Sequence, residues 1–189
     1  MEAISAFVLA GGKSLRMGSD KAFAQLEDRT LLQRALDTAS QVAQNVTIVG
    51  AHGKFAVFGR VVEDVYPNRG PLSGIHAALQ SSATEFNLIL AVDLPHVTPE
   101  LLRYLINQAQ ATPAPVTLPR TSDGWQPLCA VYRKEFAEIA DSALRQNQNA
   151  IHTLVENSVP RVIDELELHH AGFSPKLFRN INTPSDLLA

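Results

Sequence analysis

The sequence predicts a three-layer α/β/α fold around a Rossmann-like, mostly parallel sheet, in a single domain that covers residues 1–189. Short β-favouring runs alternate with helical segments along the chain, and this alternation is typical of a doubly wound sheet. The run FNLILAVDLP at 86–95 has apolar residues on both faces, as a central parallel strand requires. A chain of 189 residues fits one domain, since domains typically have about 100–200 residues.

The remaining strands are expected at short runs of apolar, β-favouring residues such as ISAFVLA, NVTIVG and PLCAVY. The run RVVEDV predicts a third strand or an edge of the sheet. These strands are expected at 4–10, 45–50, 60–65, 114–119, 127–132 and 161–164.

Helices are expected where apolar residues recur on one face behind a capping residue. The segment at 30–43 has this spacing, and Thr30 with Gln33 forms a capping-box start. Thr98 is an N-cap followed by Pro99 at the first helical position. The helices are expected at 30–43, 70–81, 98–110, 134–146 and 150–157, with a last one opened by Thr183.

The composition disfavours several classes of protein. A formal net charge of -3 argues against a general nucleic-acid binder, which shows a basic surplus. The single cysteine, Cys129, excludes an internal disulfide and favours a reducing compartment. The N-terminus lacks the basic region of a signal peptide, and no run approaches the roughly 18 apolar residues of a membrane span. We therefore expect a cytoplasmic protein that binds neither nucleic acid nor a membrane.

The stretch FVLAGGKSLRMGSDKAF at 7–23 contains a connection that runs from Ala10 to about Lys21, longer than the roughly 2–6 residues of an ordinary strand-to-helix turn. It contains neither a Walker G-x-x-x-x-G-K-[ST] motif nor a G-x-G-x-x-G dinucleotide turn. Backbone amides freed by Gly11 and Gly12 can line a phosphate, and Arg16 and Lys21 can bind its oxygens. On this loop alone, an anion site and a solvated basic loop are equal alternatives.

Two carboxylates stand at predicted strand ends, where open α/β sheets bind their ligands. Asp93 follows the apolar run at 88–92, and this placement suits Mg²⁺, which prefers one or two carboxylates plus phosphate oxygens and water. The alternative role for Asp93 is to cap the next helix, which Thr98 already does. Asp64 ends the run VVED and is equally a polar strand end or a nucleotide contact.

Five blocks of the sequence together resemble the molybdenum cofactor guanylyltransferases, nucleotidyltransferases of the glycosyltransferase-A type. LAGGKSLRMGSDKA is similar to the family's L-A-G-G-x-S-x-R-M-G-x-D-K signature. The blocks GPLSGIHAAL, LAVDLP, QPLCAVY and NINTPSDL follow in the family's order. The resemblance covers nearly the whole chain and implies the nucleotide-diphospho-sugar transferase type of the predicted fold.

The resemblance implies an enzyme that transfers GMP from GTP to molybdenum-bound molybdopterin, forming molybdopterin guanine dinucleotide cofactor and pyrophosphate. Its partners would be these two substrates, with transient contact to molybdoenzymes or their chaperones. Arg16, Lys21 and Asp93 are the implied catalytic residues, Asp93 is the implied ligand of the cofactor Mg²⁺, and Asn180 and Asn182 are the implied pterin contacts. The implied nucleotide contacts are Leu9, Ala10, Gly11, Gly12, Lys21, Asp64 and Asp93.

This reaction explains why no strong base is visible in the sequence. The attacking phosphate oxygen of molybdopterin is already ionised near neutral pH, so no proton has to be removed. An anion must attack an anion, and Mg²⁺ on Asp93 with the cations Arg16 and Lys21 would neutralise the charge. In-line positioning of the two substrates supplies the remainder.

The pterin assignment has a simpler alternative, because NINTP can be only a turn before the final helix, in which Asn bonds its own backbone. Under the functional interpretation, Asn180 and Asn182 point to the same side of an extended segment. Their amides can then donate to and accept from a pterin ring edge.

Two segments depart from the family pattern, and three other functions remain open. IVGAHGKF lacks the Asn that members can carry after the second strand, and QNQNAIHTLV lacks an Arg that some members have on the pterin side. A pterin cytidylyltransferase tends to read L-A-A-G in the first loop, unlike Gly11-Gly12 here. NINTPSDL disfavours a sugar-phosphate nucleotidyltransferase. Intact Lys21 and Asp93 disfavour a non-catalytic nucleotide-binding or cofactor-delivery protein.

Overall fold

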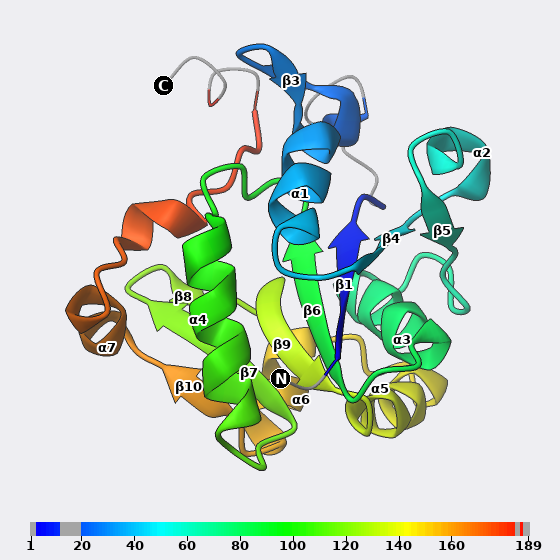
Figure 1. The fold of residues 1–189 in the computed structure, drawn as a ribbon. Helices are drawn as coiled ribbons and strands as arrows, with labels where there is room; N and C mark the ends of the chain where they lie inside the picture. Colours follow the sequence, from blue (N-terminus) through cyan, green and yellow to red (C-terminus); the bar gives the residue numbers. More distant parts are fainter. Residues whose placement is uncertain (1–2, 12–19, 184–185, 187–189) are drawn as a thin grey trace.

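The computed structural model describes residues 3–11, 20–183 and 186, and Figure 1 shows its fold. An eight-stranded sheet has the order β10-β7-β9-β6-β1-β4-β5, and β8 pairs with β7 beside it. The strands are β1 (Ile4–Leu9), β4 (Asn45–Val49), β5 (Arg60–Val62), β6 (Phe86–Ala91), β7 (Val116–Thr121), β8 (Gly124–Trp125), β9 (Cys129–Arg133) and β10 (Arg161–Ile163).

Parallel pairing dominates the sheet, as predicted. β1 pairs in parallel with β4 and β6, β4 with β5, and β10 with β7. β9 is antiparallel to both of its neighbours, β6 and β7. The chain passes from β7 to β9 through β8 without a helix, whereas a parallel connection needs a crossover of about a dozen residues or more. The alternation of strands and helices is therefore interrupted at β9, which runs in reverse.

Helices cover both faces of this sheet. The α-helices are α1 (Leu31–Ser40), α2 (His52–Phe55), α3 (Pro71–Ser81), α4 (Pro99–Gln110), α5 (Phe136–Arg145), α6 (Ile151–Asn157) and α7 (Glu165–His170). Two 3₁₀ turns, η1 (Lys21–Phe23) and η2 (Pro175–Phe178), and a small hairpin of β2 (Gln25–Leu26) and β3 (Arg29–Thr30) complete the described elements. Among the helices of the described residues, none combines the length and the apolar character that a membrane span needs.

The core consists of two apolar clusters, one on each face of the sheet. Successive side chains of a strand point to opposite faces, and in β1 Ala6 and Val8 belong to one cluster while Phe7 and Leu9 belong to the other. α1 and α4 pack on the first cluster, and α3 and α5 pack on the second. The two helix layers lie in front of and behind the sheet in Figure 1, which confirms the predicted three-layer fold.

The helix starts expected from the sequence are present. Gln33 N donates to Thr30 Oγ1 at 3.2 Å and Thr30 N donates to Gln33 Oε1 at 3.0 Å, which closes the capping box of α1. Leu101 N donates to Thr98 Oγ1 at 3.4 Å at the start of α4. Pro71 opens α3 after Gly70, whose φ is 72°, a left-handed conformation that favours glycine.

Several boundaries differ from the prediction. α1 ends at Ser40 rather than at residue 43, β6 ends at Ala91, and β5 ends at Val62, so that Asp64 lies beyond its strand. The hairpin, α2 and α7 were not predicted. Asp164 caps α7 by accepting from Glu167 N at 2.9 Å, a signal that DELE carries in the sequence. The helix expected after Thr183 falls mostly outside the described residues.

Candidate active site

Three segments that are far apart in the sequence meet at the carboxyl edge of β6. Lys21 lies on η1, Asp93 lies two residues beyond β6, and Asn182 follows η2. The Nζ of Lys21 donates to Asp93 Oδ2 at 2.9 Å and to Asn182 Oδ1 at 2.8 Å. One ammonium group therefore joins the carboxylate expected to hold a metal ion to an amide expected to contact the pterin.

The backbone of the C-terminal segment is bound to the turn that carries Asp93. Ile181 N donates to the carbonyl oxygen of Asp93 at 2.9 Å, and the Ile181 side chain is buried. The Asp186 carboxylate accepts from Asn182 N and from Thr183 N at 2.8 Å each. These backbone hydrogen bonds lower the pKa of Asp186, the one from Asn182 most. Asn182 is thus held by its main chain, and its side chain is left for Lys21.

Lys21 is placed by the residue before it. Asp20 caps η1 by accepting from Ala22 N at 3.3 Å, and its other carboxylate oxygen accepts from Lys54 Nζ of α2 at 2.8 Å. The side chains of Lys21 and Asp93 are only 18% and 24% exposed. Partial shielding from water strengthens their attraction relative to that of a surface pair.

The end of β1 lies beside the end of β4. Leu9 and Ala10 are buried and Gly11 is exposed. The amides of Ala10 and Gly11 both donate to Val49 O, at 3.0 and 3.2 Å. The expectation of a free amide at Gly11 is therefore wrong for this structure, because the neighbouring strand already binds it. Gly12 and Arg16, the other expected phosphate contacts of the loop, lie outside the described residues.

Asp64 lies over α3 at the point where that helix approaches the sheet. A Cβ atom added at Gly74 would lie 3.4 Å from Leu9, 3.5 Å from Val49 and 3.7 Å from Asp64 Oδ1. Helix, strands and carboxylate therefore meet around Gly74, at distances that are ordinary van der Waals contacts for a Cβ atom. Asp64 is exposed on one side, and partial desolvation on the other raises its pKa.

A hollow of about 180 Å³ opens next to Asp93. Asn180, the other expected pterin contact, lines it together with Trp125, Gln126 and His152. The hollow thus combines an indole ring, two amides and an imidazole beside the Asp93 carboxylate. The sequence analysis did not single out Trp125, Gln126 or His152. Trp125 is the only tryptophan of the chain and lies in the turn-forming segment DGW, which was a usable signal.

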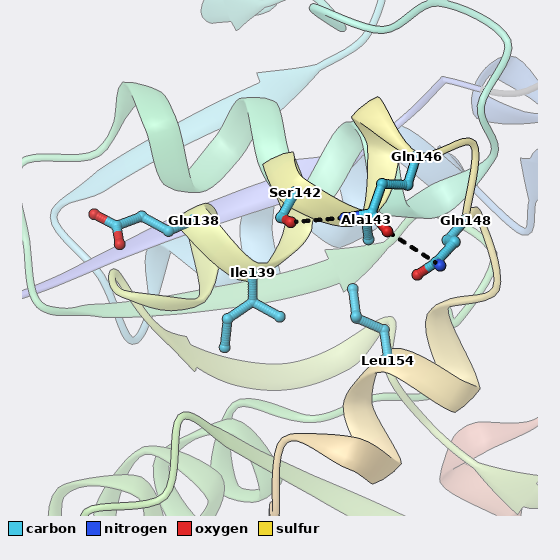
Figure 2. A pocket seen from close by; sticks show the side chains of 7 residues that line it. All are labelled: Glu138, Ile139, Ser142, Ala143, Gln146, Gln148 and Leu154. Carbon is cyan, nitrogen blue, oxygen red and sulfur yellow. Dashed lines mark hydrogen bonds between the residues drawn. The ribbon is translucent and has the colours of Figure 1, made fainter.

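A larger hollow of about 430 Å³ lies elsewhere, between α5 and α6. Figure 2 shows its lining, in which Gln146 bonds to Ser142 and Gln148 bonds to Gln146. The seven residues drawn include one carboxylate, Glu138, and no cation. They include no residue singled out in the sequence. We therefore place the candidate active site at the smaller hollow, despite the difference in volume.

The described residues also bear on the kind of metal that the site can hold. Within them, no cluster of three or more His, Cys, Asp or Glu side chains could enclose a metal ion. Asp93 offers a hard carboxylate oxygen directly beyond the end of β6. Such a donor set fits Mg²⁺, which takes its other ligands from phosphates and water, and does not fit a structural zinc site.

Comparison with known proteins places the chain among nucleotidyltransferases. A family model described as MobA-like NTP transferase domain matches residues 6–162. The chain is 32% identical to a molybdenum cofactor guanylyltransferase of Desulfosudis oleivorans, covering 99% of this chain and 94% of that protein. The crystal structure of molybdopterin-guanine dinucleotide biosynthesis protein A from Archaeoglobus fulgidus is similar with a TM-score of 0.85 and 26% identity, covering 97% and 95% of the two chains.

Gly50, directly after β4, generates a test of how this edge is packed. A Cβ atom at Gly50 would lie 2.7 and 2.9 Å from two ring atoms of Phe55. Phe55 is buried, and its ring stacks on that of Phe23 with 5.7 Å between centroids. Gly53, on α2, has no such neighbour within 4 Å.

Gly50→Ala should therefore lower the free energy of unfolding by about 1–3 kcal/mol, because the buried ring has no room to move away. The matched control, Gly53→Ala, should be neutral or slightly stabilising, since alanine favours a helix. Urea denaturation measures both variants. Equal stabilities for the two would contradict the packing described here.

Proposed function

We propose that this chain, which belongs to the MobA-like NTP transferase family, transfers the GMP group of GTP to molybdenum-bound molybdopterin and releases pyrophosphate. The family and the name of the relative support a nucleotidyltransferase role. The single observation that carries the finer proposal is the position of Lys21, whose Nζ lies 2.9 Å from Asp93 and 2.8 Å from Asn182. The residues assigned to the two substrates meet at one cation.

On the nucleotide side, the chain's own groups bind and neutralise. Lys21 would contact the triphosphate, and Asp93 would hold Mg²⁺. When bound there, Mg²⁺ supplies Lewis-acid stabilisation of the reacting phosphate and of the leaving pyrophosphate. Asp64, whose raised pKa reflects a partly desolvated carboxylate, is the proposed second contact to the nucleotide. Leu9 and Ala10 would form the buried wall below it.

On the acceptor side, the hollow beside Asp93 has the chemistry of a heterocycle site. The Trp125 indole offers a flat apolar surface, and the amides of Gln126 and Asn180 can both donate and accept. Asn182 lies at the Lys21 end of the same edge. A pterin bound here would bring its phosphate toward Asp93. The attacking oxygen of that phosphate is already ionised, so the reaction would need no proton transfer from it.

The direct experiment supplies molybdenum-loaded molybdopterin, Mg²⁺ and each of the four nucleoside triphosphates in turn. Pyrophosphate release and the mass of the dinucleotide product are measured. GTP should be the productive nucleotide. Faster transfer from CTP, or transfer to a sugar phosphate in place of the pterin, would overturn the proposal while leaving a nucleotidyltransferase.

Asp93→Asn tests the proposed metal ligand. The amide keeps the shape of the side chain but removes the charge, so kcat should fall by about 10²-fold or more at an unchanged melting temperature. Binding of Mn²⁺, followed by electron paramagnetic resonance in the presence of GTP, should weaken in parallel. The control is Asp28→Asn, at a side chain that is 79% exposed in the hairpin turn. Normal turnover with normal metal dependence in Asp93→Asn would remove Asp93 from the site.

Lys21→Ala tests the bridging cation. Loss of a charge-assisted contact should weaken Mg·GTP binding by about 10- to 150-fold, which corresponds to about 1.5–3 kcal/mol. Lys134→Ala is the matched control. Lys134 follows β9 beside the start of β6, at the edge of the sheet remote from Asp93. Calorimetric titration of both variants decides, and an affinity equal to that of the control would return Lys21 to a structural role.

Asn182→Ala separates the pterin contact from a simple turn. Its backbone bonds to Asp186 do not involve the side chain, so the melting temperature should stay near that of the wild type. The affinity for molybdopterin should fall by about tenfold, the effect of one lost hydrogen bond. The affinity for GTP should fall by less. Asn107→Ala, at an exposed site on α4, is the control. A stable variant with normal molybdopterin binding would refute the assignment.

A further inference from the structure

A second group of polar side chains lies where α5 packs on α3, apart from the residues used above. Asp141 accepts from Tyr66 Oη at 2.7 Å and from Arg145 Nε at 2.7 Å. The Nε2 of His76 lies 3.5 Å from the same carboxylate. His76 is buried, and its ring centroid lies 5.4 Å from that of Tyr66.

The charges of this group favour a fixed arrangement. The hydrogen bond from Tyr66, helped by Arg145, lowers the pKa of Asp141. Burial lowers the pKa of His76, so the imidazole is neutral near pH 7. An ionised carboxylate is a strong acceptor, and the Tyr66 hydroxyl is therefore the donor in a charge-assisted hydrogen bond.

Tyr66 belongs to the connection between β5 and α3, residues 63–70, which also carries Asp64. Hydrogen bonds to residues of α3 and of the segment after α5 fix this connection. Ser73 Oγ donates to Tyr66 O at 2.6 Å, and the Arg69 guanidinium donates to Asn147 Oδ1 just after α5. The segment itself is largely exposed, so its conformation depends on these contacts rather than on burial.

We propose that Asp141 is a positioning residue for nucleotide binding: through Tyr66 it fixes the 63–70 connection and so holds Asp64 over Gly74. The proposal rests on the proposed function in one respect, that Asp64 contacts the nucleotide. A connection that is already ordered spends less conformational entropy when the ligand binds. Asp141 itself touches no substrate in this scheme.

The chain contains a matched group on the opposite face of the sheet. Tyr104 Oη donates to Glu167 Oε1 at 3.0 Å, and Arg161 bonds to the same carboxylate. The Tyr104 ring lies 5.4 Å from that of Phe173. This group joins α4 to α7 and carries none of the proposed site residues, so it controls for the loss of a partly buried tyrosine hydrogen bond.

The test compares Tyr66→Phe with Tyr104→Phe. Each is titrated calorimetrically with all four Mg·nucleoside triphosphates, and each is melted. Tyr66→Phe should weaken binding by about five- to tenfold, the size of one lost hydrogen bond, and should raise KM with kcat near the wild-type value. Both variants should lower the melting temperature to a similar extent. Tyr104→Phe should leave nucleotide affinity unchanged.

Asp141 variants provide a second and independent measurement. Asp141→Ala should weaken binding as much as Tyr66→Phe does, and combining the two should add little, because both remove the same bond. Asp141→Asn keeps a neutral acceptor and should recover part of the affinity. Additive losses, or no recovery with Asn, would overturn the proposal, as would equal nucleotide affinities for Tyr66→Phe and Tyr104→Phe.

The outcome for this inference can be distinguished from the outcome for the proposed function. If the wild type preferred a nucleotide other than GTP, the proposed function would fail, and the variants would be compared on that nucleotide. If Asp64→Ala bound the preferred nucleotide as the wild type does, the inference and the proposed Asp64 contact would fail, while the proposed GMP transfer would stand. If the wild type bound none of the four, both would be overturned.

Discussion

The in-register parallel pairing of β1 with β6 is the constraint on which the rest of the site depends. Leu9 pairs with Ala91 at the last position of both strands, so the glycine-bearing loop and the Asp93 turn leave the sheet at the same edge. The pairing is supported from both faces, because alternate residues of β1 and β6 enter the two apolar clusters. A shift of one residue would exchange the two faces and would offset the end of β1 from the Asp93 turn.

The reversed direction of β9 adds the acceptor side to this edge. Cys129 pairs with Leu90, and Ala91 N donates to Leu128 O at 2.8 Å. Because β9 starts where β6 ends, the residues just before β9 arrive beside Asp93. Trp125 and Gln126 therefore line the hollow. If β9 were parallel to β6, its first residues would lie at the opposite edge, and the hollow would lose its indole ring.

Electrostatics at this edge prepare the site more than they stabilise the fold. The Lys21–Asp93 pair is largely shielded from water, and the cost of desolvating both charges offsets much of their attraction in the free energy of unfolding. Its consequence is positional, since Lys21 stands between the carboxylate and Asn182. The hydrogen bond between Tyr66 and Asp141 also has a positional consequence, because it holds an exposed connection in place. At the end of β4, the Phe55 ring occupies the space that a side chain at Gly50 would need.

Local signals in the sequence determined most of the central strands and the long helices, and the tertiary structure decided which of their residues meet. The capping box of Thr30 and the N-cap of Thr98 were readable because their partners lie three residues away. The strand that ends before Asp93 was readable from its apolar run.

Lys21 and Asn182 are 161 residues apart, and no local pattern relates a lysine in one loop to an amide in another. The direction of β9 and the bonding of the Gly11 amide to Val49 likewise depend on strand pairing. These features arise from contacts between distant segments, which only the folded chain brings within hydrogen-bonding distance.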